Sequence, residues 1–396
     1  MYMKDILIQN AVILPMEGMR IPNGFVWVRE GKIAAIGSMD EMGPAAQGSP
    51  VFDAQGGYLL PGLVDAHSHL GLYEDSLGFE GADGNEDTDP VTPQMRAIDG
   101  INPLDRSFAE ARAAGVTTVA VSPGSANPIG GQIAVIKTDG RRIDDMIVRA
   151  PLAIKFALGE NPKSVYHEKE EMPATRMATA ALIREQLAKA EEYARHKAEA
   201  EEDEDKDPPD FDAKLEALLP LLRGEITGHF HAHRADDIFT ALRIAREFGI
   251  RPVIVHGTEA HLVADLLAED GVPVISGPFM TDRSKPELSH LTEQAPGLLH
   301  RAGMQVAITV DHPEIPLKFL MDAARMAARN GMDEDAALRA ITIESARIAE
   351  VDDRVGSLRV GKDGDMVLFT GHPFDYQSRV RAVFCEGNCI FGRDEQ

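Results

Sequence analysis

The chain has 396 residues, of which 44% are hydrophobic and 26% charged, a composition that excludes disorder over most of its length. Its 40 basic and 64 acidic side chains give a formal net charge of −24, which disfavours nucleic acid as a partner because phosphates would be repelled. No apolar run approaches the about 20 residues that a membrane-spanning helix needs, and the first residues lack the pattern of a secretory signal, so we expect a cytoplasmic protein without a membrane partner.

Short strands are predicted at both ends of the chain. In residues 1–60, apolar residues alternate or cluster between turn signals such as Arg29-Glu30-Gly31-Lys32, and residues 355–396 show the same pattern. Neither segment holds enough apolar residues for a core of its own. We therefore expect one small β-sandwich domain built from both chain ends, with Cys385 and Cys389 as reduced thiols beside a hairpin turn.

Residues 61–354 follow a different pattern. Apolar runs such as LVDAHSHLG, VTTVAVSPG and IRPVIVHG alternate with amphipathic stretches of helical period, which is typical of strand–helix–strand units in a parallel sheet. About seven such units over roughly 270 residues fit an α/β protein with a TIM-like (β/α)8 barrel, for which ~250 residues are usual. A doubly wound open sheet is the alternative, but the GxGxxG turn that it predicts after the first strand is missing.

One segment interrupts this alternation. A long helix is predicted from Pro173 to about Lys197, and the acidic run KAEAEEDEDKDPPD follows it. Such a run is usually a solvated helix end and an exposed loop, and this one lacks the glycine and the spacing of a calcium-binding loop. We interpret residues 173–212 as an acidic helical insertion in the barrel, and the sequence assigns no role to residues 191–212.

Metal-binding side chains recur where the predicted strands end. His67 and His69 close the run that begins at Leu63, and on a strand residues i and i+2 point to one face. At the carboxyl end of a barrel strand, that face opens into the mouth where barrel enzymes keep their active sites. Other predicted strands end in the same way, with Glu160, His231, His233, His256 and Asp311.

Imidazoles and carboxylates that converge on one mouth form a candidate site for a divalent metal. This donor set suits zinc, iron, manganese or nickel, and no cysteine accompanies it. A single residue of this kind is more often a polar cap at the edge of a core, but packing does not explain the same types at several strand ends. The sequence therefore predicts one or two metal ions, with zinc preferred to iron and manganese.

Several motifs together resemble the amidohydrolase superfamily of metal-dependent hydrolases. PGLVDAHSHLG resembles its first-strand signature, AGVTTVAV its second-strand entry, VDHP its eighth-strand aspartate and GSLRVGKDGDMVLFTG its return into the small β domain. The resemblance covers essentially the whole chain. Within the superfamily, GHFHAHR followed by IVHGTEAHL is most similar to the imidazolonepropionase-like branch, which includes Xaa-Pro dipeptidases and other amide hydrolases.

The resemblance implies a role for each matching residue. His67 and His69 match the paired metal ligands of the first strand. His231 matches the fifth-strand ligand and His233 then contacts substrate, although an exchange of these two roles stays open. His256 matches a sixth-strand histidine that binds metal in some members and substrate in others. Asp311 matches the aspartate that binds metal and takes the proton of the attacking water.

The ligand that would bridge two metals has two candidates. Many two-metal relatives use a carboxylated lysine, and others use a glutamate at the end of the third strand. Lys155 lies within the strand LAIKFALGE and Glu160 at its end, with their side chains on opposite faces. Because this strand is the third by count and a strand end reaches the mouth, the prediction favours Glu160. Lys155 is the alternative bridging ligand, and it would leave Glu160 as a loop residue.

Two arginines and one loop are further candidates. Arg234 is predicted to bind a substrate carboxylate, and Arg176 offers the same two-pronged donor, although each could instead form a structural salt bridge. The loop of residues 122–132 is rich in Gly, Ser, Asn and Pro and follows a strand end. It is predicted either as an active-site lid or as a tight hairpin.

These residues predict a metal-dependent hydrolase that attacks an amide or cyclic amide bond of a small molecule with an activated water. Asp311 would act as general base and then general acid, and His256 or His233 would stabilise the oxyanion. A deaminase of a heterocyclic amine and a non-catalytic binding or assembly protein are the alternatives. The substrate is not readable from the sequence, and a homo-oligomer is expected only because relatives often form one.

Overall fold

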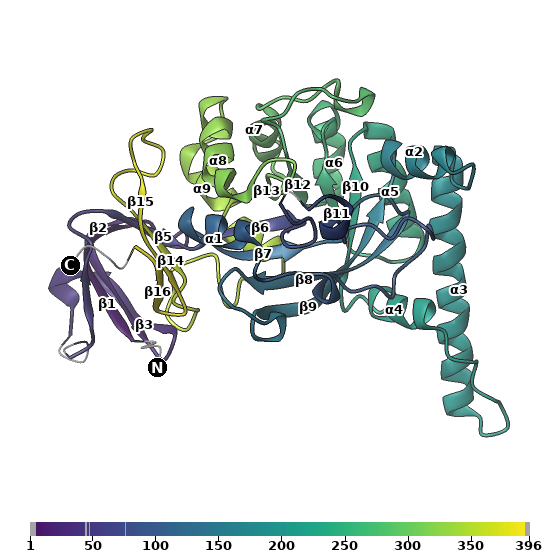
Figure 1. Cartoon of the computed structure of the whole chain (residues 1–396), viewed down its shortest axis with the longest axis horizontal. Helices are drawn as coiled ribbons and strands as arrows, with labels where there is room; N and C mark the ends of the chain where they lie inside the picture. The colour runs from purple at the N-terminus through teal and green to yellow at the C-terminus, as the bar shows by residue number, and fades with distance from the viewer. Residues whose placement is uncertain (1–4, 44–45, 47, 76, 393–396) are drawn as a thin grey trace.

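The computed structural model describes residues 5–43, 46, 48–75 and 77–392. Two sheets organise it, one on the left of Figure 1 and one inside the larger body. The strands of the first sheet come from both ends of the chain: β1 (Ile6–Ile13), β2 (Ile21–Arg29), β3 (Lys32–Ser38), β4 (Val51–Asp53), β5 (Tyr58–Pro61), β14 (Met366–Phe369), β15 (Val380–Cys385) and β16 (Asn388–Phe391).

The first sheet has the order β16-β15-β14-β5-β1-β2-β3, with β4 beside β1. It confirms that segments far apart in the sequence build one small β unit. Its strands form a single sheet, so the predicted sandwich of two sheets is not confirmed. The domain limits of 1–60 with 355–396 and of 61–354 stay predictions.

Two hairpins of this sheet follow directly from local sequence. The predicted turn signal connects β2 to β3, where Glu30 and Gly31 both have positive φ (52° and 81°), as a two-residue type I′ turn requires. Glu386 and Gly387 (45° and 76°) make the same turn between β15 and β16. Cys385 lies at the end of β15 beside that turn, and no disulfide joins it to Cys389.

The second sheet is a nearly closed barrel of eight strands that are hydrogen-bonded in chain order. Thr309 joins its two ends, because its hydroxyl donates to the His67 carbonyl oxygen at 2.6 Å. The TIM-like barrel is thus confirmed. Its strands are β6 (Leu63–Ser68), β7 (Val116–Val121), β8 (Ile129–Lys137), β9 (Ile147–Ala157), β10 (Thr227–Ala232), β11 (Pro252–His256), β12 (Val274–Ser276) and β13 (Val306–Ile308).

Strand β8 departs from the predicted parallel order. It pairs antiparallel with both β7 and β9. Residues 122–128 therefore connect β7 to β8 as a hairpin, which is one of the two structures predicted for that loop. Gly130 and Gly131 open the strand, and Gly131 has a φ of 129° at a bulge. Glycines of this kind weaken the strand signal in a sequence. As a consequence, β9 is the fourth strand of the barrel and not the third.

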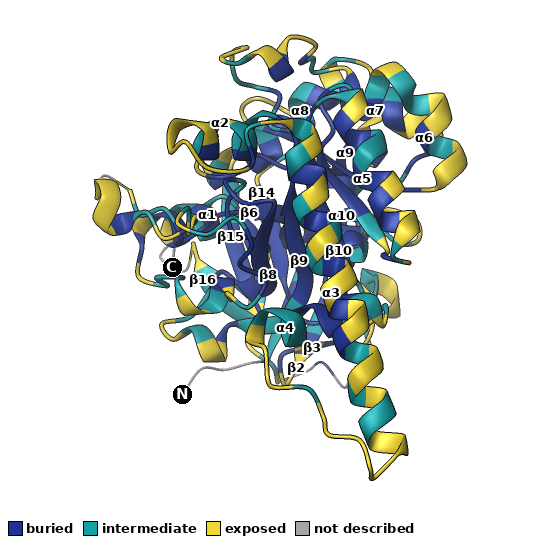
Figure 2. Cartoon of the chain, turned by 90° about the vertical axis from the view of Figure 1, so that its right-hand side faces the viewer, coloured by how far each residue is buried: buried dark blue, intermediate teal, exposed yellow. Residues whose placement is uncertain are grey.

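Ten α-helices are described, and those of the barrel region pack around the buried strands (Figure 2). None of the described helices is both long and apolar enough to cross a membrane. The helices are α1 (Arg106–Ala113), α2 (Glu160–Glu168), α3 (Arg176–Glu202), α4 (Ala213–Leu222), α5 (Ala235–Glu247), α6 (Ala264–Asp270), α7 (Ala295–Arg301), α8 (Leu320–Arg329), α9 (Glu334–Ala340) and α10 (Ile343–Ile348).

Helix α3 is the predicted long helix and extends to Glu202, beyond the Lys197 expected from the sequence. Thr175 caps its first turn by accepting from the backbone N–H of Ala178. Ile183 and Leu187 are buried one turn apart, so the first half of α3 packs on the barrel. The second half runs away from the body and leads into exposed residues 203–212, as the acidic run predicts (Figure 1).

A buried ion cluster connects the barrel to the segment that returns to the first sheet. The Lys137 ammonium on β8 lies 2.9 Å from Asp363 and 2.6 Å from Asp365, and all three side chains are at most 6% exposed. Removing one partner of such a cluster leaves an uncompensated buried charge.

We expect Lys137→Met to lower the free energy of unfolding by about 3–5 kcal/mol, because the buried Asp365 would lose its cation, while Asp363 would keep its contacts with Lys32 and Arg354. Urea unfolding followed by circular dichroism measures this. Arg142→Met is the matched control: Arg142 pairs with Asp145 at the surface, where the effect should stay below about 1 kcal/mol. Equal stability of the two variants would show that the buried cluster does not hold the two parts together.

Candidate metal centre

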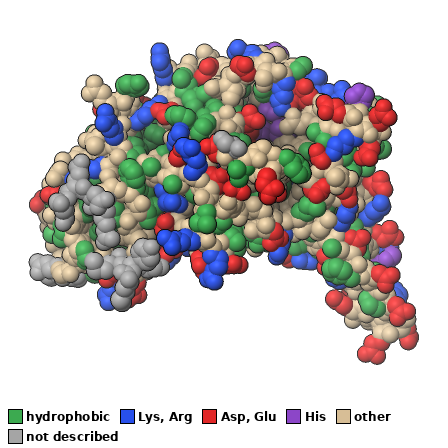
Figure 3. Space-filling model, in the orientation of Figure 1, with side chains coloured by type: hydrophobic (Ala, Val, Ile, Leu, Met, Phe, Trp, Pro, Cys, Tyr) green, Lys and Arg blue, Asp and Glu red, His purple; other side chains and the backbone are tan. Residues whose placement is uncertain are grey.

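The predicted histidines and Asp311 converge at the carboxyl ends of the barrel strands. The nitrogen and oxygen atoms of His67, His256 and Asp311 lie within 4.8 Å of one another, and so do those of His231, His233 and His256. His256 belongs to both groups, and all five side chains are buried. Histidine atoms are visible within a recess of the surface in Figure 3. The side chains that the sequence places at these strand ends therefore lie close together in the structure, as expected.

Local backbone conformation turns two of these side chains toward the centre. His256 ends β11 with a φ of 72°, and Asp311 follows β13 with a φ of 53°. The left-handed region is unfavourable for residues other than glycine, and such residues cluster at functional sites. The Asp311 backbone N–H donates to the Thr309 hydroxyl at 2.9 Å, which fixes the turn.

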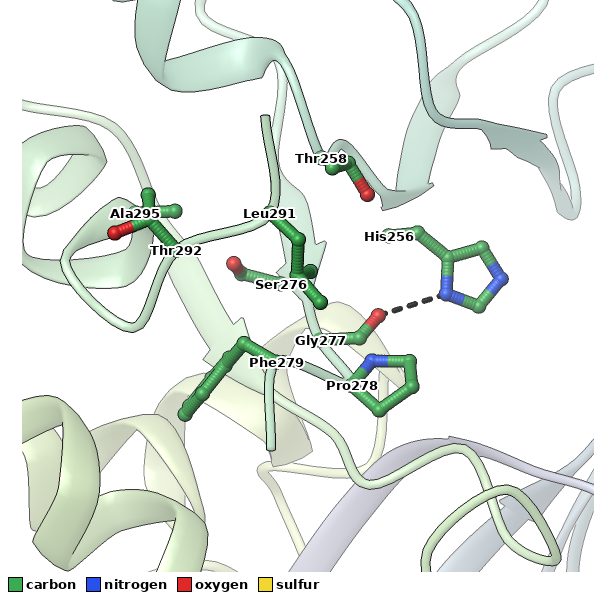
Figure 4. A pocket seen from close by; sticks show the side chains of 9 residues that line it. All are labelled: His256, Thr258, Ser276, Gly277, Pro278, Phe279, Leu291, Thr292 and Ala295. Carbon is green, nitrogen blue, oxygen red and sulfur yellow. Dashed lines mark hydrogen bonds between the residues drawn. The ribbon is translucent and has the colours of Figure 1, made fainter. Parts of the chain in front are cut away.

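Hydrogen bonds to Nδ1 orient most of the rings. A metal-binding histidine typically donates its second ring N–H to an oxygen of the protein, which fixes the tautomer and leaves the other nitrogen for the metal. Four rings have such a contact from Nδ1: His69 with Ser122 O (2.7 Å), His256 with Gly277 O (2.7 Å, Figure 4), His233 with Thr258 Oγ1 (2.8 Å) and His231 with Ser125 Oγ (3.0 Å).

The electrostatics favour the neutral form of His231, His233 and His256 and the ionised form of Asp311. Burial is the largest cause that lowers the pKa of His233 and His256 to about 3, and it holds the pKa of His231 well below its usual value. For Asp311, burial alone would raise the pKa, but His256, His67 and His69 together hold it well below its usual range. Neutral imidazole and ionised carboxylate are the forms that bind a metal.

Several buried donor and acceptor atoms at this centre have no hydrogen-bond partner within the described part of the chain. They include both ring nitrogens of His67, Oδ1 of Asp311 and Nζ of Lys155. His67 Nε2 and Asp311 Oδ1 are 3.3 Å apart but are not aligned for a hydrogen bond. A buried polar group left in this way destabilises a protein by about 1–3 kcal/mol. A bound cation would satisfy Asp311 Oδ1 and the lone pair of a His67 ring nitrogen, so these two residues fit a metal centre, whereas the Lys155 ammonium has only donors that a cation cannot satisfy.

The structure places Lys155 in the buried interior of the barrel and Glu160 outside both groups of converging side chains. The Lys155 side chain is fully buried, and its charge lowers the pKa of His67, His231 and His256, so its ammonium shares their surroundings. Burial lowers the pKa of Lys155 itself to about 8, although Asp311 opposes this. Glu160 belongs to neither group of converging side chains, because the chain turns into α2 at Gly159. The preference for Glu160 rested on counting β9 as third, and the geometry gives it no support.

Arg234 also differs from its prediction as a substrate ligand. Its guanidinium forms a two-pronged pair with Asp236 at 2.9 Å, and its side chain is 43% exposed. Arg176 pairs with Asp237 at 3.0 Å. Both arginines thus form the structural salt bridges that the sequence left as their alternative.

Sequence reasoning missed two residues near this centre. His229 is fully buried with both ring nitrogens unpartnered, and it lies two residues before His231 on the same face of β10. The alternation in HFHAH is the signal that could have found it. Ser125 carries no such signal, since its contact with His231 depends on how the 122–128 turn folds over the barrel.

A small pocket adjoins this centre beside His256 (Figure 4). Pro278, Phe279 and Leu291 give it apolar walls, and the hydroxyls of Thr258 and Ser276 line it as well. Its walls come from the segments that follow β11 and β12 and from the residues before α7.

Comparisons with known proteins agree with the fold. Residues 214–390 match a family model described as "Amidohydrolase family". The solved structure of an amidohydrolase from Thermotoga maritima MSB8 is 44% identical in sequence and superposes with a TM-score of 0.94, over 98% of this chain and 99% of that one. Family and relatives support a hydrolase that acts on carbon–nitrogen bonds, and the chain belongs to the amidohydrolase family.

Two curated relatives refine this result. An imidazolonepropionase from Geobacillus sp. (strain WCH70) is 25% identical, over 88% of this chain and 84% of its own length. Amidohydrolase tasK from Hapsidospora irregularis is 28% identical over 98% of this chain, which spans only 43% of that longer protein. The resemblance to the imidazolonepropionase-like branch is thereby confirmed.

Proposed function

We propose that the protein is a metal-dependent hydrolase that cleaves an amide or cyclic amide bond of a small molecule. The observation that carries this proposal is that two groups of buried metal-binding side chains share His256. In one of these groups, the ring nitrogens of His67 and Oδ1 of Asp311 have no hydrogen-bond partner in the described chain. Family membership indicates that the bond cleaved is a carbon–nitrogen bond. The histidines and the aspartate at the strand ends indicate that the cofactor is a divalent metal.

Two sets of ligands are available. His67, His69 and Asp311 form the first, and His231 and His256 form the second. Lys155 would be shared by both sets as a carboxylated side chain, which would give two metal ions. Zinc suits these nitrogen and oxygen donors, and iron and manganese are the alternatives. When bound, the metal supplies a Lewis acid that polarises a carbonyl group and makes a water molecule more acidic.

Asp311 is the proposed general base and acid. Its Oδ1 has no hydrogen bond within the described chain, so it can accept a proton from the attacking water. The same oxygen can then return the proton to the departing nitrogen. Hydrogen bonding of the Asp311 backbone to Thr309 keeps the carboxylate in place during both transfers.

His233 is the better candidate for contact with substrate. The Nδ1–H of His256 must donate to the Gly277 carbonyl oxygen, so the neutral His256 ring has no N–H left on Nε2. The Thr258 hydroxyl beside His233 Nδ1 can donate or accept, which allows His233 to carry its proton on Nε2. We therefore propose His256 as a ligand and His233 as the residue that hydrogen-bonds the carbonyl group.

We expect one or more equivalents of zinc, iron or manganese per chain in protein purified without chelator. Metal analysis measures this, and zinc added to chelator-treated protein should raise the melting temperature because it binds only the folded state. Protein that stays metal-free after reloading would overturn the proposal. N-acyl amino acids, Xaa-Pro dipeptides and cyclic amides form the substrate panel, while ammonia release from purines and pyrimidines would favour the deaminase alternative.

A further inference from the structure

A chain of polar contacts leads from a buried carboxylate to the metal centre. Glu287 lies in the segment between β12 and α7 and is 1% exposed, and its Oε1 is 2.9 Å from Lys285 Nζ. Lys285 Nζ donates to Asn161 Oδ1 at 2.8 Å, and Asn161 Nδ2 lies 3.4 Å from His231 Nε2. Asn161, Lys285 and Glu287 belong to none of the family motifs and to none of the predicted strand ends.

The contact with Lys285 decides how the Asn161 amide is oriented. A lysine ammonium has only hydrogen-bond donors, so the atom of Asn161 that faces it must be the carbonyl oxygen. The amide nitrogen then has to point the other way, toward His231 Nε2. His231 is held at Nδ1 by Ser125, so its Nε2 is the atom directed at the centre. Asn161 thus presents an N–H donor where the ring nitrogens converge.

Glu287 fixes both ends of this arrangement. Its Oε1 forms an ion pair with the Lys285 ammonium, and its Oε2 accepts a hydrogen bond from the backbone N–H of Glu160 at 3.0 Å. Glu160 precedes Asn161 in the first turn of α2. One buried carboxylate therefore connects the loop after β12 to the turn after β9, and it sets the distance between Lys285 and Asn161. His233 Nε2 lies 3.6 Å from the same Oε1, so one of the site histidines is also close to this carboxylate.

We propose that Asn161 is a further catalytic residue, whose side-chain N–H donates to the substrate oxygen that becomes negative. Lys285 and Glu287 are positioning residues that keep the amide in this orientation. As water oxygen bonds to the carbonyl carbon, the π electron pair moves onto the carbonyl oxygen, and Asn161 stabilises it without giving up a proton. This inference rests on the proposed hydrolase, because His231 would then hold the metal and the Asn161 N–H would be available to substrate.

The test uses methylphosphonate, a small tetrahedral anion, as a probe of the oxyanion position. Its affinity for the zinc-loaded protein is measured by calorimetry for wild type, Asn161→Ala, Lys285→Met and the double variant. Lys163→Met removes a charge from the same helix α2 and is the matched control. Zinc content and circular dichroism of every variant show whether the centre and the fold are intact.

We expect Asn161→Ala to weaken methylphosphonate binding by about tenfold, below the ~10²–10³ in turnover that loss of an oxyanion donor causes in other enzymes. Lys285→Met should weaken it several-fold in the wild-type background and not at all in Asn161→Ala, because Lys285 acts through the amide. An undiminished effect of Lys285→Met in the double variant would overturn the positioning role and show direct anion binding by the ammonium.

Other results separate this inference from the proposed function. Zinc-loaded wild type that does not bind methylphosphonate, or Asn161→Ala with wild-type affinity, would overturn the role of Asn161 and leave the hydrolase intact. Failure of wild type to bind zinc would instead overturn the proposed function. A loss of affinity in Lys163→Met equal to that in Lys285→Met would show a general charge effect, which contradicts the specific contact.

Discussion

Asp311→Asn should lower kcat/KM by about 10²- to 10⁴-fold, the range that general acid–base catalysis supplies. The amide has nearly the same shape as the carboxylate but cannot take the proton of the attacking water. The fold should be kept, because Asp311 Oδ1 has no hydrogen bond in the described chain and the backbone contact to Thr309 does not involve the side chain. Hydrolysis of a substrate from the panel, together with thermal unfolding, measures both effects.

The control for this variant is Asp322→Asn. Asp322 lies on α8 and pairs with Arg325 at 2.7 Å, with 45% of its side chain exposed. The same chemical change there should leave turnover near wild type. Since Asp311 is also a proposed ligand, metal content is measured beside activity, so that lost proton transfer is distinguished from lost metal. Near wild-type turnover in Asp311→Asn would remove its assignment as general base.

Lys155→Met should reduce bound metal from about two ions per chain to one or none. A carboxylated Lys155 would contribute an oxygen to each ion, and a methionine of similar length offers none. The metal-free variant should be at least as stable as metal-free wild type, because the change removes a buried ammonium without a hydrogen-bond partner. Metal analysis after reloading in bicarbonate buffer, with urea unfolding of the metal-free proteins, measures the two effects.

Glu160→Gln is the matched variant at the competing position. Because Glu160 lies outside both groups of converging side chains, this change should leave the metal content of wild type. Loss of metal in Glu160→Gln with full occupancy in Lys155→Met would restore Glu160 as the bridging ligand. One ion per chain in all three proteins would indicate a mononuclear site.

Much of the fold follows from local sequence patterns. Glycine after Glu30 and Glu386 makes two hairpin turns, and the helical period after Pro173 predicts α3. The alternation of apolar runs predicts the barrel. The convergence of His67, His256 and Asp311 was also predictable, because each ends a buried strand and all parallel strand ends of a barrel share one mouth.

The positions of Lys155 and Glu160 show where such patterns stop being informative. Their strand was counted as third because the two glycines of β8 hid an antiparallel strand before it. Which of the two side chains enters the barrel depends on the place of β9 in the closed sheet and on the turn at Gly159. Both are set by pairing with β8 and β10, which are separate segments of the chain.

The sequence by itself determined the family and the type of reaction and predicted the strand-end ligands, since these depend on residues close together along the chain. Only the tertiary structure brought Asn161, Lys285 and Glu287 to the centre and removed Arg234 from it. Asn161 lies in the first turn of α2 and the other two lie in the segment between β12 and α7, whereas Arg234 pairs with a neighbour two residues away. Loop side chains follow no period, so their partners are decided by how the barrel closes and how its loops pack over the mouth.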